Sequence, residues 1–313
     1  MANINTTATV NTGSGANSTK PNAFYDKVLL KTLVQRDFEH AQCAQKRDMP
    51  KHAGDTINFR KIGKLAPNLA PLVEGVTPTG DSATISAISA VTKQYGRFMT
   101  FSEVIDIQQI DPIITEYIVE QGRVMRETLD TLIVEELNKT TNIVYSGGTK
   151  DEASVTEKPS IDDFRKIRLA MRRNFVKPAK GGDYVAFISP SVSFDLQDDP
   201  KFQKAMEYSN NAKPIWDGEI ARIYGIRFIE ALNAKTDNEK GIHYSIVVGQ
   251  QAYGITKISG EGDVKSIIKS LGSSGTEDPL NQRQSIGVKV NAFVSKILDP
   301  LAVAKYVSKP TNA

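Results

Sequence analysis

The sequence is poor in the residues on which reactive sites and disulfide scaffolds depend. It has 313 residues with one cysteine (Cys43), one tryptophan (Trp216) and three histidines. A single cysteine forms no internal disulfide, which indicates a reducing, cytoplasmic folding environment. A single tryptophan provides no platform on which unpaired bases stack. The histidines (His40, His52 and His243) lie far apart without partners at metal-ligand spacing, so we expect packing or surface roles for them.

Long apolar runs and a large excess of one charge are also absent. No segment approaches the roughly 20 apolar residues that cross a bilayer, and the N-terminus lacks the basic and hydrophobic regions of a signal peptide. Lysine and arginine number 39 against 36 acidic residues, a net charge of +3. Proteins that bind duplex DNA usually carry a basic stripe along a helix or face, and we detect none. The composition predicts a soluble chain with a mixed surface, and the length predicts about two domains.

Sequence motifs of common enzyme sites are missing as well. The Ser-Pro-Ser run at residues 189–191 lacks the glycines of a nucleophile elbow. Residues 260–263 (Gly-Glu-Gly-Asp) lack the glycine spacing of a phosphate loop or a dinucleotide site. Asp198 and Asp199 together suggest a cation site, but Asp199 before Pro200 is better interpreted as a helix cap. We therefore predict no enzymatic activity and no bound metal or cofactor.

The most regular segment runs from Asp111 to Asn138. Asp111 suits the N-cap of a helix, and Pro112 suits the first helical position, which needs no amide hydrogen. Apolar side chains then recur every three, four or seven residues and predict one buried stripe. The stripe comprises Ile110, Ile114, Ile118, Met125, Leu129 and Leu132, with Tyr117 and Val124 at its edge.

On the opposite side of this helix, charged residues one turn apart predict two stabilising pairs, Arg123/Glu127 and Arg126/Asp130. A helix of about 28 residues is roughly 42 Å long, whereas a small domain is about 30 Å across. We therefore expect an elongated subunit with sheets on one side of this rod. Gly122 costs about 1 kcal/mol relative to alanine, and it is the position at which the rod would bend.

Two β segments before this helix flank a long irregular stretch. Thr56–Ile62 alternates apolar and polar residues, as a half-exposed strand does, and residues 83–101 resume a β pattern. One face of this second segment carries Tyr95, Arg97, Met99 and Phe101. Residues 63–82 between them contain three prolines and few large apolar side chains, and loops of this length are usually functional or disordered. We predict an extended hairpin arm that rests on another surface.

The N-terminal segment allows two interpretations. Residues 1–22 are rich in Thr, Asn, Ser and Gly and bury little apolar surface in isolation. They form either a disordered tail or an arm that orders only against neighbouring subunits. Residues 24–43 predict a short helix or an irregular arm with an apolar anchor.

The second half of the chain predicts short helices and many strands. Helices are expected after a cap at Ser160 and from Pro190 and Pro200. Residues 219–230 alternate for a dozen positions, which favours a strand pair or a strand bent at Gly225. Further strands are expected at residues 184–188, 244–249, 252–258, 264–268, 286–298 and 301–307. Because these elements do not alternate as βαβ units, the fold class is α+β.

Short motifs in a fixed order carry a family resemblance. They are Pro71-Leu72-Val73-Glu74-Gly75, Gln94-Tyr95-Gly96, Ile246-Val247-Val248-Gly249, Tyr253-Gly254, Gly275-Thr276-Glu277-Asp278-Pro279-Leu280-Asn281-Gln282 and Ser285-Ile286-Gly287-Val288-Lys289. With the order of elements over residues 24–307, the chain resembles a tailed-bacteriophage major capsid protein of the Hong Kong bacteriophage-type fold. The nearest subset is typified by the podovirus N-four. Val288 departs from this subset, in which we expect tryptophan.

The resemblance implies a division of the chain into arm, loop and two domains. The expected parts are an N-terminal arm (residues 1–48), an extended β-hairpin loop (49–103), a spine helix with peripheral domain (104–183), an axial domain (184–285) and C-terminal strands that return to the peripheral domain (286–313). The implied function is a shell: pentamers and hexamers form an icosahedral capsid around packaged double-stranded DNA. The implied localisation is the virion, assembled in the bacterial host cytoplasm.

The resemblance also implies partners and contact residues. Besides copies of itself, the chain is expected to meet a separate scaffolding protein, a portal and a decoration protein, with packaged DNA nearby and no membrane. Expected inter-subunit contacts are Arg60, Lys64, Leu72, Glu74 and Arg97. Because capsids of this family usually expand on DNA packaging, Gly122 is the expected hinge of the spine. The alternatives are an encapsulin-like nanocompartment shell and a phage tail or decoration protein.

Overall fold

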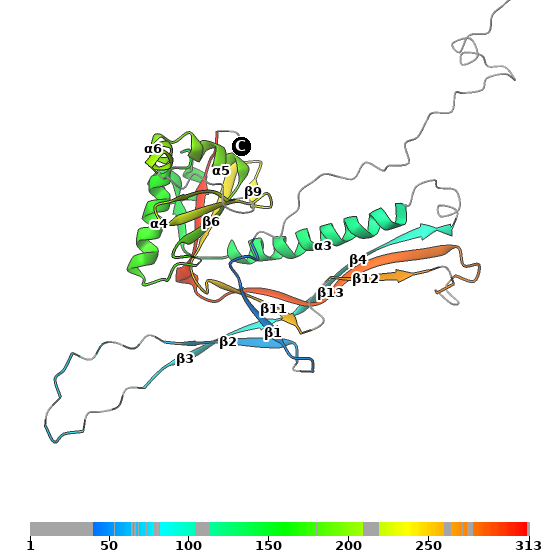
Figure 1. Cartoon of the computed structure of the whole chain (residues 1–313), viewed down its shortest axis with the longest axis horizontal. Helices are drawn as coiled ribbons and strands as arrows, with labels where there is room; N and C mark the ends of the chain where they lie inside the picture. The colour runs from blue at the N-terminus through cyan, green and yellow to red at the C-terminus, as the bar shows by residue number, and fades with distance from the viewer. Residues whose placement is uncertain are drawn as a thin grey trace, which may run out of the picture.

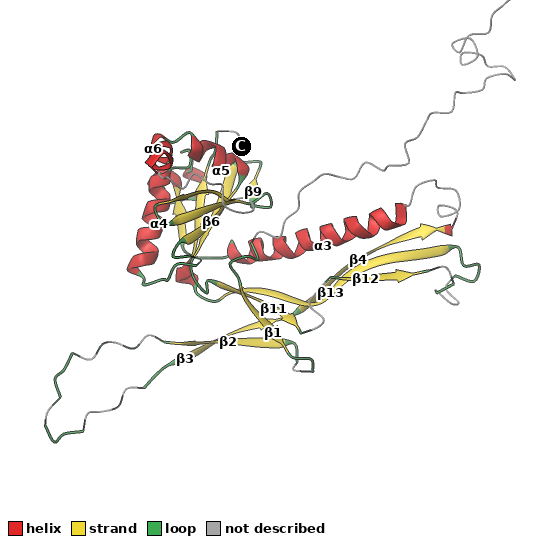
Figure 2. Ribbon diagram, in the orientation of Figure 1, coloured by secondary structure: helices red, strands yellow, loops and turns green. Residues whose placement is uncertain are grey.

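The computed structural model describes residues 40–103, 113–208, 219–259 and 264–311, with gaps at 53, 64, 66, 68, 73, 78, 79, 81, 180, 271 and 274–277. Figures 1 and 2 show a globular part with most of the helices, an elongated part in which one long helix lies along a sheet, and a projecting hairpin. The predicted elongated α+β subunit is confirmed. The predicted helix start at Asp111 and Pro112, the N-terminal segment up to residue 39, and Trp216 lie outside the described residues.

The elongated part is built on the longest strand, β13 (Arg283–Ile297). Its first half pairs antiparallel with β4 (Lys93–Ser102) on one side and with β12 (Lys265–Lys269) on the other. Its last residues pair with β11 (Tyr253–Ile258), and β1 (Gln45–Met49) adds parallel to β11. We call these five strands the long sheet.

The globular part contains a second sheet of seven strands, which we call the compact sheet. Its strands are β5 (Ile143–Tyr145), β14 (Val303–Ser308), β10 (Ile242–Val248), β6 (Tyr184–Ile188), β8 (Ile226–Glu230) and β7 (Glu219–Ile223), with β9 (Thr236–Asp237) beside β10. The helices that accompany it are α4 (Ile161–Arg173), α5 (Pro190–Gln197) and α6 (Pro200–Tyr208). Every residue of β6 and β10 is buried, as expected for strands covered on both faces.

Local sequence signals account for the boundaries of several elements. The Ser160 side chain caps α4, as predicted, by accepting from the backbone N–H of the second helical residue. The Asp199 carboxylate accepts from the Lys201 N–H at 2.9 Å and from the Ile161 N–H at 3.2 Å. The cap interpretation of Asp199 is therefore confirmed, and this one carboxylate serves the first turns of both α4 and α6.

The hairpin differs from the expected single return strand. β2 (Thr56–Ile62) pairs with β3 (Ile85–Val91) over seven residues each. At Thr92 the chain leaves the hairpin, where the Thr92 N–H donates to the Asp55 carbonyl at 2.9 Å. Residues 93–102 then form β4 in the long sheet. Thr92 is therefore the junction between arm and body, and it does not lie inside one long strand.

The helix α3 (Ile113–Leu137) is continuous through Gly122. The predicted apolar stripe is confirmed at Met125 and Leu129, which are buried. Further along, Leu132 is only half-buried, and Ile133 and Leu137 are fully buried instead. The observed spacing of four places these side chains on one face of the helix.

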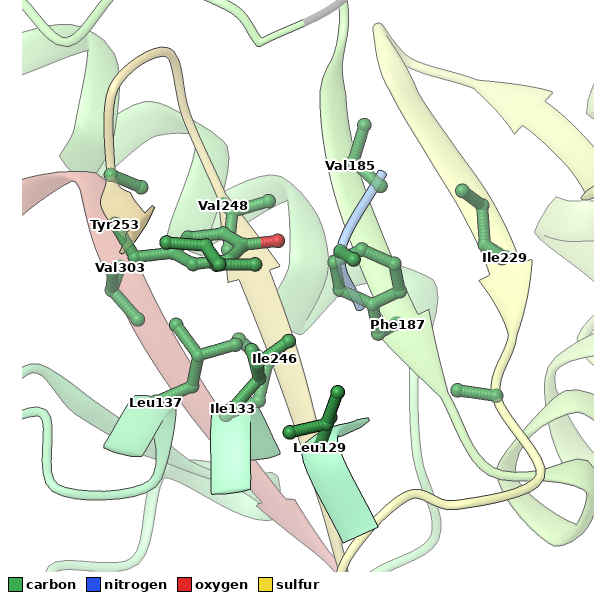
Figure 3. Packing of buried hydrophobic residues seen from close by; sticks show 14 of the residues in the cluster. Leu129, Ile133, Leu137, Val185, Phe187, Ile229, Ile246, Val248, Tyr253 and Val303 are labelled. Carbon is green, nitrogen blue, oxygen red and sulfur yellow. The ribbon is translucent and has the colours of Figure 1, made fainter. Parts of the chain in front are cut away.

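The main core forms where the C-terminal half of α3 meets both sheets. In Figure 3, Leu129, Ile133 and Leu137 of α3 point toward side chains of the compact sheet and toward Tyr253 of the long sheet. The same cluster of buried residues contains Phe187 of β6 and Phe293 of β13. The two sheets therefore share one core, with the end of α3 between them.

The predicted surface pair Arg126/Asp130 is wrong. Asp130 is fully buried, and its carboxylate accepts from the His40 backbone N–H at 3.1 Å and contacts the His40 Nδ1 at 2.8 Å. The Asn233 amide donates to the same carboxylate at 3.1 Å, and the Tyr253 hydroxyl donates to the His40 carbonyl. The Asp130 carboxylate thus holds the segment before β1 against α3, and it does not lie on a solvent-exposed face of the helix.

A second buried polar cluster lies beside the compact sheet. The Ser189 Oγ and the His243 Nδ1 are 2.7 Å apart, and the same Oγ caps α5 by accepting from the Val192 N–H. The Asp195 carboxylate accepts from the Thr311 N–H at 2.7 Å. Burial lowers the pKa of His243, against an opposing contribution from the Asp195 carboxylate. The Ser189 hydroxyl thus caps α5, and the Asp195 carboxylate holds the C-terminal segment at Thr311.

The buried pair predicts a large asymmetry between Asp130→Ala and Arg126→Ala. Removing the Asp130 carboxylate leaves His40 buried without its partner, and breaking a buried pair costs about 3–5 kcal/mol. Arg126 is exposed, so Arg126→Ala should change the free energy of unfolding by no more than about 0.5 kcal/mol. Denaturant unfolding measures both. Equally small effects would contradict the assignment.

The His243 environment predicts acid sensitivity. Because the folded-state pKa lies below the unfolded value of about 6.5, the unfolded chain binds a proton first as the pH falls. Stability is therefore fully present above about pH 6.5 and decreases as the pH falls below that value and through the folded-state pKa. In His243→Gln the decrease in melting temperature over this range should be smaller, whereas the exposed-site control His52→Gln should behave as the wild type. Parallel curves for the wild type and His243→Gln would refute this role.

Candidate assembly surfaces

The base of the hairpin is anchored in the subunit. Phe59 of β2 is buried in a small cluster with Leu298. A Cβ atom at Gly254 would stand 2.9 Å from the Phe59 ring, so the ring fits only against glycine. On the outer side, the Lys61 ammonium and the Asp299 carboxylate are 2.7 Å apart. These contacts fix the direction in which the hairpin leaves the body.

The outer part of the hairpin is not packed against its own subunit. Figure 1 shows the loop between β2 and β3 projecting away from both sheets. Large apolar side chains along it are 53% to 89% exposed. They are Ile62, Leu65, Leu69, Leu72, Val76 and Ile85, and we call them the apolar row of the arm. Exposed large apolar side chains gathered on one segment favour a site of interaction, so this row is a candidate surface for contact with a partner.

The structure brings some of the expected contact residues together on this arm. Arg60 is exposed on β2, and Leu72 and Glu74 are exposed in the loop, where Gly75 adopts a φ of 79°. Lys64 lies outside the described residues. Arg97 is exposed on β4, opposite Val288 in the long sheet. The arm residues and Arg97 therefore lie on two different elements.

A hollow of about 360 Å³ lies where the arm joins the body. It is lined by residues of β3, β4, α3 and β13, including Tyr95, Leu132 and Glu136. The buried Glu136 carboxylate contacts the ammonium groups of Lys139 at 2.8 Å and Lys296 at 2.9 Å. Burial acts to raise the pKa of Glu136, but the hydrogen bonds from both lysines outweigh it and lower the pKa. The wall of the hollow therefore carries charged groups, and its buried carboxylate is paired with two lysines.

The long sheet exposes a second apolar patch. Phe98 of β4 and Ile267 of β12 lie opposite Gly287 of β13 from its two sides. Directly opposed residues share a face of a sheet, and both apolar side chains are exposed. A Cβ atom at Gly287 would come within 3.3 Å of the Phe98 Cβ. Glycine thus allows the close approach of β4 and β13 at Phe98. Sequence reasoning missed this patch because its members are far apart in the chain.

Gly122 lies near the middle of α3. A Cβ atom added there would meet no atom within 4 Å. Packing therefore does not require glycine at this position. The cost in helix propensity remains, at about 1 kcal/mol relative to alanine.

Two further classes of site are absent from the residues that the structure describes. Among them, no three His, Cys, Asp or Glu side chains come together as metal ligands. None of their helices combines the length and the apolar character that a bilayer span needs.

Comparison with known proteins relates the chain to a family. The profile of the family described as "Phage capsid protein" matches residues 85–306, more than two thirds of the chain. The capsid protein of cyanophage P-SCSP1u is similar over 99% of this chain and 100% of its own, with 15% identity and a TM-score of 0.70. The capsid protein of cyanophage Pam1 covers 96% and 100%, with 14% identity and a TM-score of 0.72. No curated protein sequence matches the chain.

An encapsulin, the SrpI protein of Synechococcus elongatus PCC 7942, shares the fold less closely. It covers 91% of both chains, with 11% identity and a TM-score of 0.57. At such identities the structural likeness establishes the fold alone, and the family profile decides between the two kinds of shell. The encapsulin alternative is therefore not favoured. The chain belongs to the phage capsid protein family, as a major capsid protein of the tailed-bacteriophage type.

Proposed function

We propose that copies of this chain close into pentamers and hexamers that tile an icosahedral shell around packaged double-stranded DNA. The observation that carries the proposal is the apolar row of the arm, which is exposed in the single subunit. Head-to-tail contacts close into rings when the rotation between subunits allows it. Each arm then lies across the adjacent subunit, and Arg60, Lys64, Leu72, Glu74 and Arg97 supply contacts between copies.

The free energy for such assembly is available in the arm. Burying one large apolar side chain contributes about 1.5–3 kcal/mol, so six contribute on the order of 10 kcal/mol before the costs of association are subtracted. Permanent assemblies bury roughly 2,000–5,000 Å² per interface. An arm that reaches a neighbour provides such area without a larger core.

The two sheets suggest separate roles in the shell. We assign the compact sheet and its helices to the axial domain, which meets its copies around the centre of each ring. This assignment differs from the boundaries expected from the sequence, because β5 and α4 were expected in the peripheral domain. The long sheet with α3 is assigned to the peripheral domain, where the patch of Phe98 and Ile267 is available to neighbouring capsomers. β13 belongs to the long sheet and β14 to the compact sheet, so on this assignment the C-terminal segment connects the two domains.

The remaining partners follow from the same proposal. Assembly takes place in the bacterial host cytoplasm with a separate scaffolding protein and a portal, and a decoration protein binds the finished shell. The rival function is a tail or decoration protein, which would form tubes or coat a preformed shell. Light scattering on the purified chain separates these cases, because closed megadalton particles favour the capsid.

Deleting residues 64–82 should abolish shell formation and leave the subunit folded. In the native hairpin the Gly63 N–H donates to the Thr84 carbonyl at 2.8 Å. The deletion therefore leaves Gly63, Ala83 and Thr84 as a short loop between paired strands, a length that hairpins commonly use. Negative-stain microscopy should show subunits or capsomers without shells. Normal particles would overturn the role of the arm.

A milder variant tests the apolar row itself. Leu65→Ser, Leu69→Ser and Leu72→Ser together keep the length of the arm and remove exposed apolar surface only. We expect an unchanged melting temperature of the subunit and a strongly reduced yield of shells. The control replaces Leu280 and Leu301, which are exposed outside the arm, by serine and should assemble normally. Equal yields from both variants would argue against the apolar row.

Gly122→Ala should stiffen the spine helix. Because the added methyl group meets no neighbour, helix propensity alone should raise stability by about 1 kcal/mol. We expect particles of this variant to assemble but to expand less readily on DNA packaging, measured as particle diameter by electron microscopy. Val119→Ala, one turn earlier on an exposed position, is the control. Normal expansion of Gly122→Ala particles would refute the role of Gly122 as a hinge.

A further inference from the structure

The helix α4 carries a strongly basic outer face. Its 13 residues include Arg165, Lys166, Arg168, Arg172 and Arg173. The core-facing residues Phe164, Ile167 and Met171 alternate with them and are buried. At 3.6 residues per turn, Arg165, Arg168 and Arg172 share one side of the helix. The expectation that no helix carries a basic stripe is therefore wrong.

Carboxylates neutralise only the first half of this helix. Asp162 pairs with Arg165 at 3.1 Å and with Lys201, and Asp163 pairs with Lys166 at 2.7 Å. Within the described part of the chain, no carboxylate forms an ion pair with Arg168, Arg172 or Arg173. The Nε of Arg168 is buried and has no hydrogen-bond partner among the described residues. The second half of α4 thus presents positive charge that is not paired.

The basic side chains border a hollow and are held in position. The hollow has a volume of about 520 Å³ and is lined by Asp162, Arg165, Lys166, Arg168, Leu169 and Arg172. The Arg165 guanidinium lies over the Tyr224 ring, 4.8 Å from its centre. A Cβ atom at Gly225 would lie 3.1 Å from the Arg168 guanidinium. The turn between β7 and β8, in which Tyr224 and Gly225 both have positive φ, therefore packs closely against these arginines.

We propose that Arg165, Arg168 and Arg172, with Arg173 beside them, form a binding site for the phosphate backbone of duplex DNA; we call it the α4 basic stripe. The proposal rests on the proposed function, which places DNA inside the shell. A guanidinium matches the oxygens of a phosphate in a bidentate manner. Arg165 and Arg172 are seven residues apart, about 10 Å along the helix. Phosphates follow each other every 3.4 Å of axis per strand, so the stripe spans roughly three of them.

The nature of the stripe favours a polyphosphate over a second copy of the chain. The 36 acidic residues of the sequence nowhere form a run longer than two, so no single extended segment of a neighbouring subunit offers a row of carboxylates. Cations in the last helical turn also stabilise the helix dipole, but this effect is confined to that turn. It accounts for Arg172 and Arg173 and does not account for Arg168, whereas Arg165 already has Asp162 as its partner. Phosphate contacts carry no sequence information, so the binding is independent of sequence.

The test measures binding of the purified full-length chain to a short fluorescent duplex by anisotropy, between about 50 and 200 mM salt. The variant is Arg168→Gln with Arg172→Gln. The control is Lys269→Gln with Lys289→Gln, which removes the same charge from exposed positions on the long sheet. Each phosphate contact contributes about 0.9 to the slope of log K against log salt. The arginine variant should therefore lower the magnitude of the slope by about 2, and the control should not change it.

Two outcomes overturn the proposal. One is an equal slope for the wild type and the arginine variant. The other is wild-type binding to labelled polyglutamate without binding to the duplex, which would assign the stripe to an acidic polypeptide. Negative-stain microscopy of the same preparations separates failure of the stripe from failure of the shell. If the wild-type chain forms shells but the salt slope of DNA binding is the same in the arginine variant, only the proposed DNA site is refuted. If the wild-type chain forms no shells, the proposed function is refuted, whatever the DNA binding.

Discussion

The burial of one end of α3 between two sheets is the constraint on which the shape of the subunit depends. Met125, Leu129, Ile133 and Leu137 contribute to a single cluster with strands of both sheets. Because both sheets pack against the same end of the helix, they do not stack on each other as the two layers of a compact domain. The rest of α3 instead lies along β4 and β13 (Figure 1). The elongated form thus follows from how the core is divided along one helix.

An elongated subunit exposes surfaces that a compact one would bury. The hairpin is held firmly at Phe59 and Lys61, while its apolar row faces solvent in the single chain. Phe98 and Ile267 expose further apolar surface on the long sheet. Exposed patches of this kind are a liability for an isolated protein and an advantage for an assembling one. Rigid anchoring also limits the entropy lost when a partner covers the arm.

Sequence predicted the elements whose causes are local. The buried strands β6 and β10, the Ser160 and Asp199 caps, and the hairpin β2–β3 all follow from short-range patterns. Asp130 was missed because its partner His40 is 90 residues away, and periodicity alone favours a helical pair with Arg126. The change of sheet at Thr92 depends on pairing with β13, which no local pattern encodes. The contact patch of Phe98 and Ile267 escaped prediction for the same reason.

The proposed α4 basic stripe would allow a chain of nearly neutral composition to bind a polyanion. A net charge of +3 over 313 residues produces only a weak field at a distance. Arginines gathered on one helix face, most of them without an ion pair to any described residue, would provide a few phosphate contacts, whose strength falls steeply with salt. Each site alone then binds weakly, and many copies in a shell act together. Weak, sequence-independent contacts allow DNA to slide while the shell fills, whereas a strongly basic lining would hold the first turns in place. On the proposed function, a local stripe on a nearly neutral chain therefore suits a shell that DNA enters by sliding.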